Sequence, residues 1–165
     1  MNIRRLVKHL FIPDWLVQRA FPDMLLRRIE QAIAASESRH GGQLRFVVEA
    51  ALELPLLWRG RTARQRAAQL FSELRVWDTE YNCGVLIYVQ LHDRRVEILA
   101  DRGISARVKQ QDWDAICRRL EQAYGRGEYE AGTLAALDEV TALLQQHFPA
   151  GSSDANELPD RPLLI

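Results

Sequence analysis

Residues 75–103 read RVWDTEYNCGVLIYVQLHDRRVEILADRG, and this stretch decides the fold. Its apolar run at 84–91 is too short for a full helix and predicts a buried strand. Residues 92–94 predict a turn, and the alternation of apolar and charged residues at 95–101 predicts an antiparallel neighbour with one wetter face. The stretch therefore predicts a β-hairpin that ends at Gly103.

Helical and strand-like patterns lie on both sides of this hairpin. Apolar residues recur at helical spacing in residues 23–39, 62–74, 111–124 and 130–147. Residues 44–52 (LRFVVEAAL) have the continuous apolar centre of a strand buried on both faces. A helix joins this strand to the first hairpin strand, so the two should be parallel, with a right-handed connection. We therefore predict an α/β protein: a three-layer, Rossmann-like α/β/α sandwich around two parallel strands and one antiparallel hairpin strand.

The sequence divides into three parts. Residues 1–22 form a basic, apolar N-terminal arm, residues 23–148 form the α/β/α domain, and residues 149–165 form a C-terminal tail. The tail begins with Gly, Ser, Asp and Asn, a composition typical of a mobile segment. Its last residues, ELPDRPLLI, have the apolar content to dock on the domain or on a partner.

The N-terminal arm has two interpretations. Basic residues outnumber acidic ones across 1–28, a balance typical of an interfacial anchor, so residues 1–20 are a candidate for peripheral membrane contact. The other interpretation is an arm or short helix that packs on the domain's own core. We favour the second, because Pro13 interrupts the apolar run.

Composition argues against several classes of function. The formal net charge is +0, so no overall field draws the chain onto nucleic acid. No apolar run approaches the ~20 residues of a spanning helix, and no small-residue cleavage site follows the N-terminal charges. We therefore expect a cytoplasmic protein, and the alternative is a protein in peripheral contact with the inner membrane. Cys83 and Cys117 show neither a disulfide framework nor metal-ligand spacing.

Several motifs of the chain resemble the TPM domain. The resemblance rests on NCGVLIYV (82–89), DRRVEI (93–98), Gly103-Ile104 and GEYEAG (127–132), and it extends from about residue 23 to 148. It implies a bacterial domain of the kind encoded near LemA-type membrane proteins. Some members of this family are described as acid phosphatases, and some bind calcium or another divalent cation. The chain departs from the family pattern at 76–81, 101–102 and 105–109, so neither property carries over residue by residue.

The acidic residues around the hairpin fall into two groups. Asp78 and Glu80 precede the first hairpin strand, and Asp101 ends the second, antiparallel strand, so these three should meet at one edge of the sheet. Glu53 and Asp93 follow the carboxyl ends of the two parallel strands, where ligand sites of α/β proteins lie. The sequence therefore predicts one three-acid edge and a second acidic edge opposite it.

Two interpretations of the first acidic edge stay open. Three carboxylates with the side-chain oxygen of Asn82 are the ligand type that Ca²⁺ or another divalent cation prefers, which makes Asp78, Glu80 and Asp101 candidate metal ligands. Alternatively, the acids form ion pairs that fix the loops, with the arginines nearby in the sequence: Arg64, Arg102 and Arg107.

The sequence carries no motif for nucleophilic catalysis or phosphate cradling, such as Gly-x-Ser-x-Gly or a Walker loop. We therefore expect a non-catalytic interaction or regulatory domain that acts with a membrane-protein partner. The alternative is a divalent-metal-dependent, acid-phosphatase-like phosphoesterase. Trp58, Trp77 and Tyr81 lie in the loops around the crossover helix. If exposed they would form a binding patch, and if buried, as we favour, they would close the small core.

Overall fold

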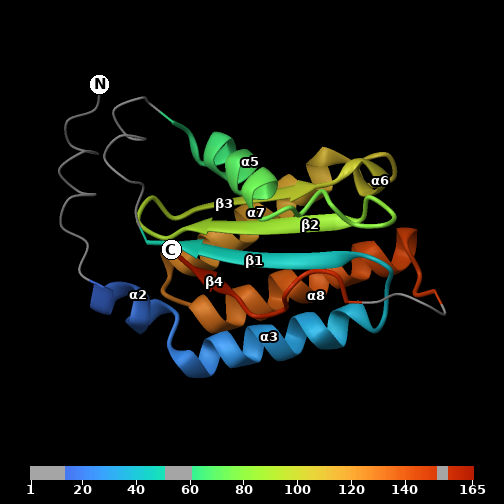
Figure 1. Ribbon diagram of the computed structural model, residues 1–165. Helices are drawn as coiled ribbons and strands as arrows, with labels where there is room; N and C mark the ends of the chain where they lie inside the picture. The colour runs from blue at the N-terminus through green and yellow to red at the C-terminus, as the bar shows by residue number, and fades with distance from the viewer. Residues whose placement is uncertain (1–13, 51–60, 152–155) are drawn as a thin grey trace.

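The computed structural model describes residues 14–50, 61–151 and 156–165 (Figure 1). The helices are α2 (Asp14–Ala20), α3 (Asp23–Glu37), α5 (Ala63–Glu73), α6 (Arg102–Ser105), α7 (Gln110–Gly125) and α8 (Tyr129–His147). The strands are β1 (Gln43–Glu49), β2 (Gly84–Gln90), β3 (Arg95–Ala100) and β4 (Leu163–Leu164).

The sheet has the strand order β3-β2-β1-β4. β1 and β2 are parallel, and β2 and β3 are antiparallel, which confirms the predicted mixed sheet. The register aligns Glu49, Gln90 and Arg95 across the three strands at the carboxyl ends of β1 and β2. The fourth strand, β4, adds parallel to β1 at the other edge and was not predicted.

Helices cover both faces of the sheet, as Figure 1 shows. On one face, α3, α7 and α8 enclose the larger core, which contains Phe46, Ile87 and Trp113. On the other face, α5 packs over a smaller core that contains Val47, Leu86 and Leu158. The three-layer α/β/α sandwich is therefore confirmed.

A reciprocal cap begins the helix that joins the parallel strands. The Thr62 hydroxyl accepts a hydrogen bond from the Gln65 backbone N–H at 3.2 Å, and the Gln65 side chain accepts one from the Thr62 N–H at 3.1 Å. Both donors would otherwise be unpaired at the helix start. The cap fixes where α5 begins, at the carboxyl end of the sheet.

The described part of the N-terminal arm packs on the core. Phe21 is buried, and its ring lies 6.0 Å from that of Tyr124 and 6.3 Å from that of Phe46. This supports the second interpretation for residues 17–21, whereas residues 1–13 lie outside the described residues. In the part of the chain that the structure describes, no helix is long and apolar enough to span a membrane.

The C-terminal tail requires a correction. Leu158 is buried in the smaller core, and Leu163 and Leu164 pair with Val47 and Val48 of β1. The segment ELPDRPLLI thus docks on the domain itself, because it covers an edge that would otherwise expose unpaired backbone groups. The expectation of a mobile tail therefore does not describe residues 156–165, and residues 152–155 are not described.

Candidate functional site

The first predicted acidic edge is built around the loop 75–82, between α5 and β2. Asp78 and Glu80 are exposed on this loop, whereas Asp101 is buried. Asp101 is the N-cap of α6, where its Oδ1 accepts the Arg102 backbone N–H at 2.7 Å. Its Oδ2 is buried and has no hydrogen-bond partner. The Asp101 side chain therefore caps α6, while the other two acids face solvent.

The structure does not bring the three predicted metal ligands into one site. Among the described residues, no three His, Cys, Asp or Glu side chains lie in a group that could hold a metal ion. The Asn82 Oδ1, predicted as a further ligand, accepts a hydrogen bond from the Arg102 guanidinium at 3.1 Å. This guanidinium places a positive charge beside a predicted ligand atom. The arrangement therefore does not fit a divalent ion as it stands.

Within the described ranges, the predicted ion pairs between the nearby arginines and the three acids are not found, because the arginines have other partners. Arg64 pairs with Glu97 at 3.5 Å and donates to the Ile98 carbonyl at 2.9 Å. Arg102 binds Asn82, as above, and Arg107 binds the His147 carbonyl and lies 4.7 Å over the Phe148 ring. Among the described residues, no ion pair joins these arginines to Asp78, Glu80 or Asp101. The loop is thus held by other means.

Backbone contacts hold the loop 75–82. The Thr79 hydroxyl accepts the Cys83 N–H at 2.9 Å, and the Asn82 carbonyl accepts the Gly103 N–H at 3.0 Å. A Cβ atom at position 103 would lie 2.7 Å from that carbonyl, so only glycine permits this approach. Asn82 itself has a φ of 53°. The loop is therefore fixed to the start of α6.

The same loop exposes two aromatic side chains. Trp77 is 48% exposed and Tyr81 is 59% exposed. This corrects the expectation that they close the core, a role that Val76 and Cys83 fill with smaller side chains. Trp58 lies outside the described residues. An exposed indole and phenol on one fixed loop are typical of a contact surface.

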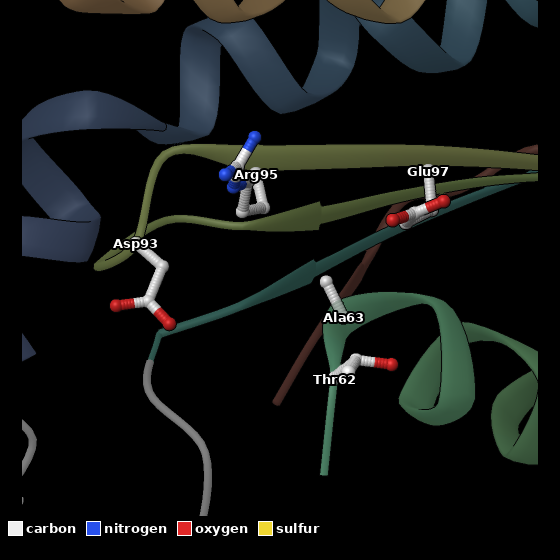
Figure 2. Close-up of a pocket in the computed structure, with 5 residues that line it drawn as sticks. All are labelled: Thr62, Ala63, Asp93, Arg95 and Glu97. Atoms are coloured by element: carbon white, nitrogen blue, oxygen red, sulfur yellow. The ribbon is translucent and has the colours of Figure 1, made fainter. Parts of the chain in front are cut away.

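The second acidic edge borders a cavity of about 510 Å³. Figure 2 shows Asp93 in the hairpin turn, Glu97 on β3, and Thr62 and Ala63 at the start of α5, all around this space. Arg95 also lines it, but its guanidinium turns away from α5 and lies 3.6 Å from Glu121 of α7. Glu53, the other residue predicted here, lies outside the described residues.

A buried polar network lies beside this edge, and sequence reasoning missed it. The Glu49 carboxylate accepts two bonds from the Arg66 Nε, at 3.0 and 3.2 Å, and lies 2.8 Å from its Nη2. The Tyr88 hydroxyl donates to the same carboxylate. Burial and the Glu49 carboxylate raise the pKa of Tyr88, so its phenol stays protonated as the donor. Arg66 also lies 3.7 Å from Glu73 through its Nη1, and the buried part of the network satisfies the Glu49 carboxylate within the fold, which it therefore stabilises.

The two cysteine thiols and the serine of a buried serine–histidine pair could act as nucleophiles, but none of them is activated. Burial raises the pKa of Cys83, and burial raises the pKa of Cys117 to about 12, so both thiols stay protonated. In the buried pair of Ser36 and His40, the ring Nδ1 accepts the Gly42 N–H at 3.1 Å. The Nε2 must then donate to the Ser36 Oγ, 2.7 Å away, so the imidazole cannot act as a base toward it.

One carboxyl group at the β4 side of the sheet has an unusual environment. Glu37, at the end of α3, accepts the Leu44 N–H at 2.7 Å through its Oε1, and its Oε2 is buried. Burial raises its pKa from 4.5 to about 8; the Leu44 N–H opposes the rise, whereas the charge of Asp160 and a hydrogen bond with its carboxyl group add to it. Glu37 is thus protonated at neutral pH.

This protonation predicts that stability falls as pH rises. Between pH 4.5 and about 8 the folded chain keeps a proton on Glu37 that the unfolded chain has released, so the free energy of unfolding decreases with pH. Glu37→Gln should reduce this decrease in the free energy of unfolding by about 1–2 kcal/mol. Glu80→Gln changes an exposed carboxyl group, so this control variant should show the same decrease as the parent. Urea unfolding from pH 5 to 9 measures this. The same slope in Glu37→Gln and the parent would contradict it.

Comparison with known proteins agrees with this geometry. The family model described as the TPM domain matches residues 20–143. No curated protein matches the chain. The NMR structure of the BA42 protein from the psychrophilic bacterium Bizionia argentinensis is similar, with a TM-score of 0.75 and 25% identity, over 86% of this chain and 93% of that one. The matched span covers β1, β2 and β3 and the helices on both faces, apart from the end of α8, so the chain belongs to the TPM domain family.

Proposed function

We propose that this chain is a non-catalytic interaction domain whose contact surface is the loop 75–82. We further propose that its partner is a membrane protein, bound through a Lys/Arg-rich segment beside the membrane. The observation that carries the proposal is the exposure of Trp77 and Tyr81, at 48% and 59%, on a loop held by backbone contacts. The few residues that carry most of the binding energy at protein interfaces are enriched in Trp and Tyr.

The loop carries two exposed acids against one exposed base, Arg75, and this balance favours a basic partner. Asp78 and Glu80 are exposed next to the two aromatic rings, and Glu157 joins them, since its carboxylate accepts the Glu80 N–H at 3.1 and 3.3 Å. Lysine and arginine side chains can pair with these carboxylates and also stack on the rings. Cytoplasmic segments beside membrane spans carry an excess of Lys and Arg. Such a segment therefore matches the loop in both respects.

The fixed shape of the loop favours binding as well. The bonds from Gly103 to Asn82 and from Cys83 to Thr79 order the loop before any partner arrives. A loop that is already ordered loses less conformational entropy on binding than a flexible one. Rigid presentation of the two rings therefore supports an interaction role.

Site-specific photo-crosslinking in cells tests this proposal. A benzophenone amino acid in place of Trp77 or Tyr81 should form an adduct with one membrane protein, at a Lys/Arg-rich segment mapped by mass spectrometry. The same group in place of Met24, which is 70% exposed on α3, is the matched control and should not form this adduct. Equal adducts at all three positions, or adducts that map outside a basic segment, would contradict the proposal.

The alternative function, a divalent-metal-dependent phosphoesterase, has one observation in its favour. The Oδ2 of Asp101 is buried and unpartnered, as an unfilled ligand position would be. Asp78 and Glu80 do not join it in a metal-binding group, so we derive no reaction from it. Amide NMR shifts at Asp101 with millimolar CaCl₂ or MgCl₂, lost in Asp101→Asn, would favour this alternative.

A further inference from the structure

A buried chain of hydrogen bonds joins α3 to α8 and begins at the ring of His40. His40, Ser36 and Thr141 are all buried. The His40 Nε2 lies 2.7 Å from the Ser36 Oγ, which lies 2.6 Å from the Thr141 Oγ1, and Thr141 donates to the Leu137 carbonyl at 2.6 Å. Figure 1 shows the two helices side by side on the same face of the sheet. The hydrogen-bond chain therefore crosses the contact between them.

The two ends of this chain fix the position of each proton. The Leu137 carbonyl can only accept, so the hydroxyl proton of Thr141 is used there, and the Thr141 oxygen accepts from Ser36. The hydroxyl proton of Ser36 is then used as well, so its oxygen accepts from the His40 Nε2–H. On the other side of the ring, the Gly42 N–H donates to Nδ1 at 3.1 Å, which requires a lone pair there. Both ends therefore require a neutral imidazole with its proton on Nε2.

The Nδ1 bond lies in the turn 38–42 between α3 and β1, and this turn is attached to the end of α8. The Gly41 N–H donates to the Phe148 carbonyl at 2.9 Å. His40 itself forms an antiparallel β-bridge with Pro149. The ring therefore holds the turn at the point where it meets the end of α8.

A second proton on the ring would break this arrangement. It would sit on Nδ1, where its N–H would face the Gly42 N–H, so that two donors would replace one hydrogen bond. The imidazolium would also be a charge in a buried place, which costs free energy. Opening of the turn relieves both effects, because it exposes the ring to water.

The charged groups on the elements packed around the ring favour its neutral form. On α3, Arg39 binds a side chain of α8, and Glu37 keeps its proton at neutral pH. The carboxyl group of Asp160 is hydrogen-bonded to that of Glu37. At the end of α8, His147 is the titratable side chain, and the Arg107 guanidinium donates to its carbonyl at 2.8 Å. Arginine cations on both sides thus oppose a second positive charge at the ring.

We infer that His40, through its bonds to Ser36 and Gly42, is an acid-sensitive latch: protonation of its ring releases the turn 38–42 from the end of α8. The latch is closed at neutral pH and opens as the pH falls. It does not involve the loop 75–82 and does not rest on the proposed function.

The free energy of unfolding does not isolate this latch. A histidine that stays neutral in the folded chain makes this free energy decrease as the pH drops below about 6.5, because the unfolded chain then binds the proton. The Glu37 carboxyl group acts in the opposite sense between pH 4.5 and about 8. The two effects partly cancel, so a local measurement at the turn is needed.

NMR on the full chain follows the latch directly. The ring ¹⁵N shifts of His40 should show the proton on Nε2 at pH 7. Below about pH 6.5, and until the ring itself titrates, each unit of acidification should lower the hydrogen-exchange protection factors of the Gly41 and Gly42 amides roughly tenfold. The amide of Ile87, in the centre of β2, should keep its protection.

His40→Gln separates the ring proton from other effects of acid. A glutamine amide can accept from Gly42 and donate to Ser36, but it does not take up a proton in this range. The Gly41 and Gly42 protection factors should then change by less than about twofold between about pH 5 and 7. His147→Gln, at a partly exposed histidine, is the matched control and should show the same fall as the parent.

Three results would overturn the inference. They are a His40 ring with its proton on Nδ1, a parent chain whose Gly41 and Gly42 protection does not change with pH, and an equal fall in His40→Gln. The first two measurements use the parent chain, so they decide the matter even where His40→Gln does not fold.

Discussion

Gly84→Ala should lower the free energy of unfolding by about 3–5 kcal/mol, which is a fall in Tm of about 10 °C for a domain of this size. Gly84 is the first residue of β2, and a Cβ atom there would lie 1.9 Å from the Val76 carbonyl oxygen and 2.9 Å from its carbonyl carbon. Both neighbours are backbone atoms, so neither can rotate away. Accommodation requires either β2 or the loop 75–82 to shift, and each is tied to the core through residues such as Val76 and Cys83.

Gly125→Ala is the matched control for this glycine. No atom lies within 4 Å of a Cβ built at Gly125, which ends α7 on the surface. Alanine is favoured over glycine in a helix, so this change should be neutral or slightly stabilising. Thermal unfolding followed by circular dichroism compares the two variants. A Gly84→Ala variant as stable as Gly125→Ala would show that the close approach of Val76 to β2 is not required.

Arg66→Ala should cost about 3–5 kcal/mol, because it leaves the Glu49 carboxylate buried without its cation. Both side chains of this pair are nearly inaccessible, at 11% and 4% exposed. The remaining partner, the Tyr88 hydroxyl, can supply only one hydrogen bond to the carboxylate. The double variant Arg66→Met with Glu49→Leu removes the charge as well as its partner, and it should recover much of the lost stability.

Arg119→Ala is the matched control for the buried pair. Arg119 also pairs with a carboxylate, that of Glu139, but these side chains are 55% and 38% exposed. Exposed pairs contribute about 0–1 kcal/mol, so this variant should unfold almost as the parent does. Urea unfolding at pH 7 measures all three variants. Similar losses for Arg66→Ala and Arg119→Ala would contradict a role of the buried network in stability.

The parts of the fold with a strong local pattern could be predicted from the sequence. The run GVLIYVQ has no polar face and can only be a buried strand, and the joining helix requires β1 and β2 to be parallel. The reciprocal cap of Thr62 and Gln65 was visible as well, since it depends only on residues three apart.

β4 could not be predicted in this way. It contains two residues, follows Pro159 and Pro162, and depends on Gln43 and Arg45 more than a hundred positions earlier in the chain. No local pattern reports such a contact. The burial of Arg66 was hidden for a related reason, because an arginine on a helix usually faces solvent unless a distant carboxylate such as Glu49 meets it.

The candidate site shows the same limit. Chain topology correctly separates Asp93 from Asp78 and Glu80, since it fixes the edge of the sheet at which each loop lies. It does not report that Asp101 turns inward to cap α6, and this is why the three acids do not form one group. The exposure of Trp77 also depends on how the loop leaves α5, where Arg75 has a φ of 53°.

The central claim, that the loop 75–82 is the contact surface, is tested most directly by amide NMR on the full chain. The ligand is a synthetic Lys/Arg-rich peptide that corresponds to a segment beside a membrane span. The proposed function predicts shifts at Trp77, Asp78, Glu80 and Tyr81, with loss of binding in a Trp77→Ala, Tyr81→Ala chain and unchanged binding in Met24→Ala. Shifts centred on α7 and α8, or binding that survives the loss of both rings, would contradict the claim.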